Sequence, residues 1–133
     1  MPDDAVLEGL VEAARAIRAQ AYAPYSGFLV GAALLAGGRV FTGVNVEVAS
    51  YPISVCAERN AVAAMVAAGE RRVEAIAVVT DARTPTPPCG GCRQCLWEFG
   101  PHAVVVAHTL GGARARWPLV ELLPSAFGPS DLA

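Results

Sequence analysis

The spacing of apolar residues along the chain predicts alternating helical and extended segments. From Val6 to about Ala21, apolar residues recur three or four positions apart with charged residues between them, which is typical of an amphipathic helix. Residues 28–35 and 40–46 are mostly apolar and flank Gly37-Gly38, a pair that favours a tight turn. These segments predict a β-hairpin directly after the first helix.

The second half of the chain continues this alternation. We predict helices from about Cys56 to Gly69 and over residues 91–99, and buried strands over residues 73–79 and 103–107. A strand at 114–117 and a helical turn at 119–122 follow. This order predicts an α/β fold, a three-layer α/β/α sandwich in which helices flank a mixed sheet. Residues 1–133 contain no repeat and no long linker, so we expect a single domain.

The composition restricts the class of partner and the location. Of the 133 residues, 54% are hydrophobic and 17% are charged, which is typical of a folded domain. A formal net charge of −2 supplies no basic field for a phosphate backbone, so we expect no nucleic-acid partner. The first residues are acidic where a secretory signal would be basic, and no apolar run reaches membrane-spanning length. We therefore expect a cytoplasmic protein that does not associate with membranes.

Three of the four cysteines form a pattern suited to zinc catalysis. Cys89 and Cys92 lie one helical turn apart at the start of a predicted helix, and Cys56 begins another. Three protein ligands leave one tetrahedral position for water, which distinguishes a catalytic zinc site from a structural one. Glu58, two residues after Cys56, is then the expected proton carrier, because zinc deaminases pair a metal ligand with a nearby glutamate that does not bind the metal. We expect Arg59 to donate to a cysteine sulfur.

The fourth cysteine, Cys95, offers an alternative in which all four sulfurs close around a structural zinc and the protein is a non-catalytic binding module. On a continuous helix Cys95 lies roughly 9 Å further along the axis than Cys89. Two sulfurs on one zinc are at most about 4.6 Å apart. We therefore expect Cys95 to be a buried or half-buried thiol, and we expect His102 and His108, which flank a predicted strand, to lie outside the metal site.

Five short motifs, in order along the chain, resemble those of the small homotetrameric zinc-dependent cytidine deaminases. They are Ala23-Pro24-Tyr25-Ser26-Gly27-Phe28, Gly43-Val44-Asn45-Val46-Glu47, Cys56-Ala57-Glu58-Arg59, Pro88-Cys89-Gly90-Gly91-Cys92-Arg93-Gln94 and Leu122-Leu123-Pro124-Ser125-Ala126-Phe127. The resemblance covers nearly the whole chain and implies that family's fold.

The resemblance also implies roles for residues that spacing alone does not assign. Phe28 would line the nucleoside pocket, and Asn45 and Glu47 would hydrogen-bond the ribose hydroxyls. Ala57 and Pro88 would also contact substrate, and the backbone carbonyl before the cysteine pair would accept a hydrogen bond from the departing amine. Tyr51 and Phe127 would reach into a neighbouring subunit's site, so the implied assembly is a homotetramer.

The activity that follows is hydrolytic deamination of cytidine and 2'-deoxycytidine to uridine and 2'-deoxyuridine, with release of ammonia. Zinc-activated water would attack C4 of cytosine while Glu58 moves the proton to N3 and then to the amine. A deaminase of a cytosine-bearing antibiotic such as blasticidin S is the alternative enzyme. Many cytidine deaminases carry asparagine where this chain has Val48, so the range of substrates stays open.

Overall fold

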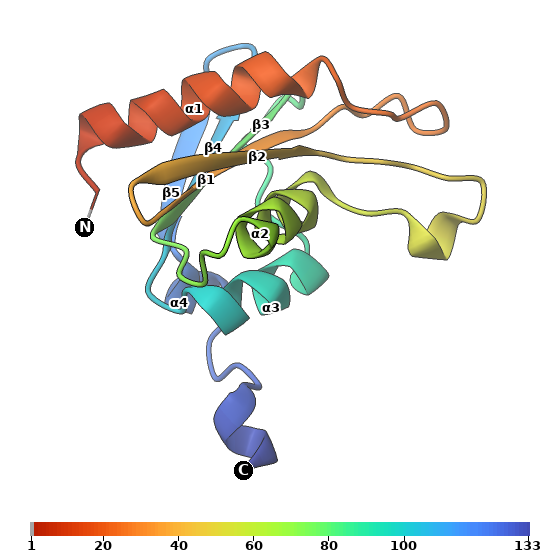
Figure 1. The fold of residues 1–133 in the computed structure, drawn as a ribbon. Coiled ribbons are helices and arrows are strands. Elements are labelled where there is room, and N and C mark those ends of the chain that lie inside the picture. Colours follow the sequence, from red (N-terminus) through yellow and green to blue (C-terminus); the bar gives the residue numbers. More distant parts are fainter. Residues whose placement is uncertain (1) are drawn as a thin grey trace.

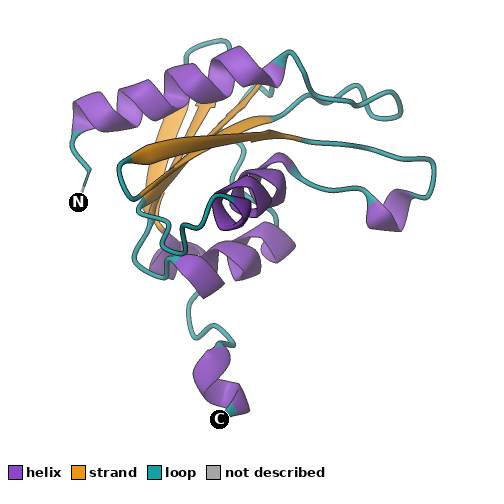
Figure 2. Cartoon of the chain, viewed as in Figure 1, coloured by secondary structure: helices purple, strands orange, loops and turns teal. Residues whose placement is uncertain are grey.

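The computed structural model describes residues 2–133 as a five-stranded sheet covered by helices on both faces (Figures 1 and 2). The strands lie in the order β2-β1-β3-β4-β5. In chain order the elements are α1 (Asp4–Arg18), β1 (Gly31–Ala36), β2 (Arg39–Val44), the 3-10 turn η1 (Tyr51–Ile53), α2 (Ala57–Ala67), β3 (Ala75–Thr80), α3 (Gly90–Phe99), β4 (Val104–Thr109), β5 (Arg114–Pro118), α4 (Leu119–Leu122) and η2 (Pro129–Leu132). The predicted α/β class is confirmed.

The sheet is mixed, as predicted. β1 pairs antiparallel with both β2 and β3, β3 pairs parallel with β4, and β4 pairs antiparallel with β5. A parallel pair needs a crossover connection, and α3 supplies it between β3 and β4. All residues of β3 and β4 are buried because helices cover both faces of the sheet at its centre.

Helix α1 covers one face of the sheet by itself (Figure 1). The Asp3 side chain caps its N-terminus by accepting a hydrogen bond from the Val6 amide at 2.9 Å. Its buried face packs Leu7, Leu10 and Val11 against small and branched side chains of β1, β3 and β4. The periodicity that predicted an amphipathic helix therefore corresponds to one buried face.

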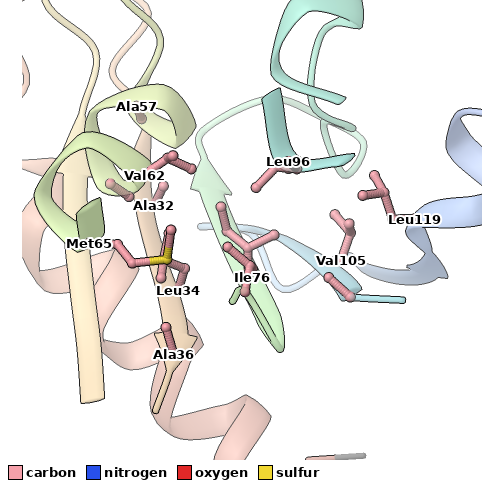
Figure 3. Packing of buried hydrophobic residues seen from close by; sticks show 13 residues of the cluster. Ala32, Leu34, Ala36, Ala57, Val62, Met65, Ile76, Leu96, Val105 and Leu119 are labelled. Atoms are coloured by element: carbon pink, nitrogen blue, oxygen red, sulfur yellow. The ribbon is translucent and has the colours of Figure 1, made fainter. Parts of the chain in front are cut away.

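Three helices, α2, α3 and α4, cover the opposite face and enclose the larger core cluster (Figure 3). Met65 from α2, Leu96 from α3 and Leu119 from α4 converge on Ile76 and Val105 of the central strands. All five side chains are essentially inaccessible to solvent. This packing fixes α2 and α3 relative to the sheet and to each other, which in turn positions their N-terminal ends.

Several predicted boundaries differ from the observed ones by two or three residues, and tertiary hydrogen bonds explain those at α1, β1 and β2. Helix α1 ends at Arg18 rather than about Ala21, because the next segment turns away and the Tyr22 amide donates to the Asn45 carbonyl at 3.0 Å. β1 begins at Gly31 rather than Phe28, because the peptide groups of residues 28–30 bind side chains instead of a neighbouring strand. β2 ends at Val44 rather than Val46, because the Val46 amide donates to the Val55 carbonyl at 2.9 Å instead of pairing with β1. None of the described helices is long and apolar enough to span a lipid bilayer.

Candidate metal centre and substrate site

The N-terminal ends of α2 and α3 carry the first two predicted ligands. Cys56 is the N-cap residue of α2 and Cys89 is the N-cap residue of α3, both with extended backbone angles. Neither side chain caps its own helix, so both sulfurs are available for another partner. Helix N-termini carry partial positive charge from unpaired amide groups, which favours thiolates at these positions.

Three sulfurs converge at this place. The Sγ atom of Cys89 lies 3.4 Å from that of Cys92 and 3.8 Å from that of Cys56. The three ligand atoms all lie within 4.8 Å of one another. Sulfurs that share a tetrahedral zinc at about 2.3 Å are separated by about 3.8 Å, so the observed spacing fits such an ion. Within residues 2–133 this is the one such group found, and Cys95 is outside it as predicted.

The thiols in this group influence one another strongly. A hydrogen bond with Cys92 and a contact with the Arg59 guanidinium lower the pKa of Cys56 to about 5, against the opposing effect of burial. The same hydrogen bond with Cys56, together with burial, raises the pKa of Cys92 above its usual range. The first thiolate therefore forms easily, and its negative charge opposes the formation of a second one. A divalent cation between the sulfurs would relieve this repulsion.

Glu58 lies in the first turn of α2, directly beside the sulfur group. Its side chain is only 5% exposed. Burial raises the pKa of Glu58, and the nearby charge of Cys56 raises it further. A carboxyl group in such a place takes up and releases a proton closer to neutral pH than an exposed one does. The position suits the predicted role of proton carrier.

Arg59, the residue after Glu58, also lies close to Cys56. Its hydrogen bond with the Cys56 sulfur raises the pKa of the guanidinium, and its Nη2 atom donates to the Ser54 carbonyl at 3.3 Å. The Nε atom of Arg59 is buried and finds no partner among the described residues. The guanidinium thus brings positive charge to a site that would carry the charge of three thiolates.

Asn45 and Glu47 lie beyond the end of β2, and both hold the loop that contains Phe28. Asn45 accepts from the Val30 amide at 2.9 Å and donates to the Phe28 carbonyl at 2.8 Å. Glu47 accepts from the backbone amides of Tyr25 and Ser26 and from the Ser26 hydroxyl. The Ser26 hydrogen bonds lower the pKa of Glu47, so its carboxylate stays ionised.

The other predicted contact residues divide into buried and exposed ones. Ala57 and Pro88 are buried beside Glu58 and Cys89, respectively. Tyr51 is 63% exposed and Phe127 is 57% exposed, which is high for aromatic rings. The Tyr51 ring lies against another exposed ring, that of Tyr25, in an edge-to-face arrangement with a centroid distance of 5.3 Å.

Two residues with roles in the site were missed from the sequence. Ser26 connects Glu47 with the Phe28 amide: its hydroxyl donates to the Glu47 carboxylate and accepts from the Phe28 amide at 3.0 Å. Arg93 donates from Nε to the Pro88 carbonyl at 2.7 Å and from Nη1 to the Leu122 carbonyl at 2.8 Å. Both residues belong to motifs of the resemblance, but each also binds a residue more than 20 positions away, Glu47 for Ser26 and Leu122 for Arg93, so spacing gave no signal.

Comparison with known proteins identifies the family. Residues 5–108 match the model of the cytidine and deoxycytidylate deaminase zinc-binding region. The chain belongs to this family. It is 43% identical over 129 residues to the cytidine deaminase of Sporosarcina psychrophila, covering 96% of this chain and 95% of that one. It is 46% identical over 125 residues to the cytidine deaminase of Halalkalibacterium halodurans, covering 92% and 95% of the two chains.

Solved structures agree with this assignment. The crystal structure of cytidine deaminase from Burkholderia pseudomallei superposes with a TM-score of 0.87 at 48% sequence identity, covering 90% of this chain and 98% of that one. The cytidine deaminase from Mycobacterium tuberculosis superposes with a TM-score of 0.82 at 40% identity, covering 96% and 99%. The fold of this family member is therefore that of cytidine deaminases, and its three-cysteine group lies in the family's zinc-binding region.

Proposed function

We propose that this deaminase converts cytidine and 2'-deoxycytidine to uridine and 2'-deoxyuridine with release of ammonia. The observation that carries the proposal is the convergence of Cys56, Cys89 and Cys92 beside the buried Glu58. The similarity over nearly full length to proteins named cytidine deaminase supports this choice of substrate. With Cys95 outside the group, the geometry favours a catalytic site over a closed structural one.

Zinc is the metal that these ligands suit best. Three sulfurs at the observed spacings match the distances and softness that zinc prefers, and they leave a fourth position open. When bound, zinc would act as a Lewis acid that makes water nucleophilic near neutral pH. The positive ends of α2 and α3 and the Arg59 guanidinium would offset the charge of the three thiolates.

Glu58 would carry protons through the reaction. As a carboxylate it accepts a proton from the attacking water, and as a neutral acid it donates that proton to N3 of the cytosine ring. It then takes the proton of the new C4 hydroxyl and delivers it to the departing amine, so that the C4–N bond breaks, ammonia leaves and C4 becomes a carbonyl. Its burial supports this role, because a low-dielectric site raises the carboxyl pKa toward neutrality. The Pro88 carbonyl, with one lone pair engaged by Arg93, keeps a second for the departing amine.

The sugar would bind at Asn45 and Glu47. Each uses part of its hydrogen-bonding capacity to hold the Phe28 loop, but Asn45 keeps one free N–H and Glu47 keeps unused acceptor capacity on Oε2. One donor and one acceptor are what a single ribose hydroxyl needs. Phe28 is half-buried and lies in the loop that Asn45 and Glu47 hold, so its ring would form an apolar wall of the pocket.

A homotetramer with shared sites is part of the proposal. Tyr51 and Phe127 are too exposed to belong to the core of a single subunit, and a second copy would cover them. Sedimentation velocity would show a species of four chains, while a monomer that turns over cytidine would contradict shared sites. We also propose a cytoplasmic location, where the four cysteines, all free in the structure, stay reduced.

The decisive experiment compares substrates on one zinc-loaded preparation. Cytidine, 2'-deoxycytidine and blasticidin S are each followed by ultraviolet absorbance and ammonia release, with Glu58→Ala as the matched control. We expect cytidine turnover that falls by about 10² to 10⁴ in the control, which still binds zinc. Selective turnover of blasticidin S would replace the proposed substrate with the antibiotic. If the zinc-loaded protein turns over none of the three substrates, the proposal that it is a deaminase is contradicted and a non-catalytic binding module is favoured.

A further inference from the structure

The short segment 28–30 connects the Phe28 loop to β1. Its backbone hydrogen bonds are made with side chains of other residues. Asn45 binds the Phe28 carbonyl and the Val30 amide, at 2.8 and 2.9 Å. The carbonyl between them, that of Leu29, accepts from Nε of Arg18 at 2.9 Å. Arg18 thus fixes this segment together with Asn45 and with Ser26, whose hydroxyl accepts from the Phe28 amide at 3.0 Å.

The position of Arg18 is set by close packing of α1 against β1. Arg18 is the last residue of α1, and a Cβ atom built on Gly31 would lie 2.9 Å from the Arg18 Cβ and 2.1 Å from the Ala14 carbonyl oxygen. Glycine at this position lets the last turn of the helix approach the start of the strand. The Arg18 side chain is only 15% exposed, so packing also limits its conformations.

The same guanidinium contacts a second segment that leads to the site. Its Nη2 atom lies 3.4 Å from Oδ2 of Asp81, the first residue after β3. Asp81 begins the loop that runs to Pro88 and Cys89. The two contacts use different nitrogens of the planar guanidinium, Nε and Nη2, and a lysine has only one side-chain nitrogen to place at these two positions.

We infer that Arg18 is a positioning residue for substrate binding: it holds the Phe28 segment against the loop that carries Pro88 and Cys89. Arg18 touches no substrate itself and acts through the Leu29 carbonyl, so its loss should weaken nucleoside binding more than it slows the chemistry. The inference rests on the proposed role of Phe28 as a wall of the nucleoside pocket.

The test measures KM and kcat for cytidine in the zinc-loaded full chain. Arg18→Met removes both contacts, and we expect KM to rise about five- to tenfold while kcat stays within about twofold and zinc content is unchanged. Arg15→Met is the matched control, because Arg15 lies one turn earlier on α1 and pairs only with Glu12. It removes the same charge and should leave both constants unaltered.

Two further variants separate the possible results. Arg18→Lys keeps the charge and the packing but only one contact, so KM should rise about threefold; this variant decides the question if Arg18→Met does not fold. Wild-type KM in the folded Arg18 variants, even with a lower melting temperature, would overturn the inference. Phe28→Ala should raise KM independently; if it does not, the proposed pocket wall is wrong and the inference fails with it.

The contact with Asp81 needs its own test. Asp81→Asn should raise KM less than Arg18→Met, because Asp81 is 52% exposed and its ion pair is weakened by solvent. In the Arg18→Met background, Asp81→Asn should not raise KM further, as expected for two residues that act through one contact. Fully additive effects would show that Asp81 acts without Arg18 and would overturn the link between the two segments.

Discussion

Gly43 offers a direct test of how the sheet positions Glu58, the proposed proton carrier. This residue lies in β2, where α2 crosses the strand closely enough that a Cβ atom would lie 2.4 Å from both the Ala57 carbonyl oxygen and the Ala61 amide nitrogen. The Ala57 carbonyl belongs to the peptide group that joins Ala57 to Glu58. Replacing Gly43 by alanine therefore presses on the turn of helix that carries Cys56 and Glu58.

The size of the effect follows from the missing space. A contact at 2.4 Å is about 1 Å short of ordinary van der Waals separation, and both opposing atoms belong to the backbone. The first turn of α2 must shift by a similar distance or the strand must bend. Overpacking of this kind costs about 1 to 3 kcal/mol of unfolding free energy. A misplacement of about 1 Å at reacting groups lowers kcat by up to about 10².

The assay combines urea denaturation, zinc content and steady-state cytidine turnover for Gly43→Ala. Gly9→Ala is the matched control, because a Cβ at Gly9 meets no atom within 4 Å and alanine favours the interior of α1. The control should gain about 0.5 to 1 kcal/mol of stability with unchanged activity. Wild-type stability and wild-type kcat in Gly43→Ala would refute the argument that this close approach positions Glu58.

Three more predictions test other parts of the structure. Cys95→Ala should keep full zinc content and near-native turnover, and loss of zinc would contradict the three-cysteine site. Ser26→Ala should raise the pKa of Glu47 toward its usual value and raise KM for cytidine, both measurable by pH-dependent kinetics; an unchanged KM would argue against Glu47 at the sugar. Burial lowers the pKa of His108 in the folded chain. As pH drops below about 6.5, His108 of the unfolded chain therefore takes up a proton more readily than that of the folded chain, and stability falls. His108→Gln should lose less stability than the wild type between pH 7.5 and 5.5 in urea titrations, and an identical loss would contradict this assignment.

The sequence alone determined the features that depend on local patterns. Apolar spacing predicted the order of helices and strands, because each buried face needs a fixed periodicity. The group of three cysteines was also predictable, since Cys89 and Cys92 lie one turn apart and Cys56 precedes a glutamate at a helix start. Cys95 was excluded by the rise of the helix, a local quantity that the structure confirms.

Only the tertiary structure decided what depends on contacts between distant segments. The sheet order brings the N-termini of α2 and α3 together. It places the Sγ atom of Cys56 3.8 Å from that of Cys89, which is 33 positions further along the chain. The start of β1 was predicted wrongly because the side chains of Asn45 and Arg18 bind backbone groups that periodicity assigns to a strand. The ends of α1 and β2 were predicted wrongly because the next residues form backbone hydrogen bonds with other segments. Such long-range hydrogen bonds leave no spacing in the sequence, because their partners become neighbours only when the chain folds.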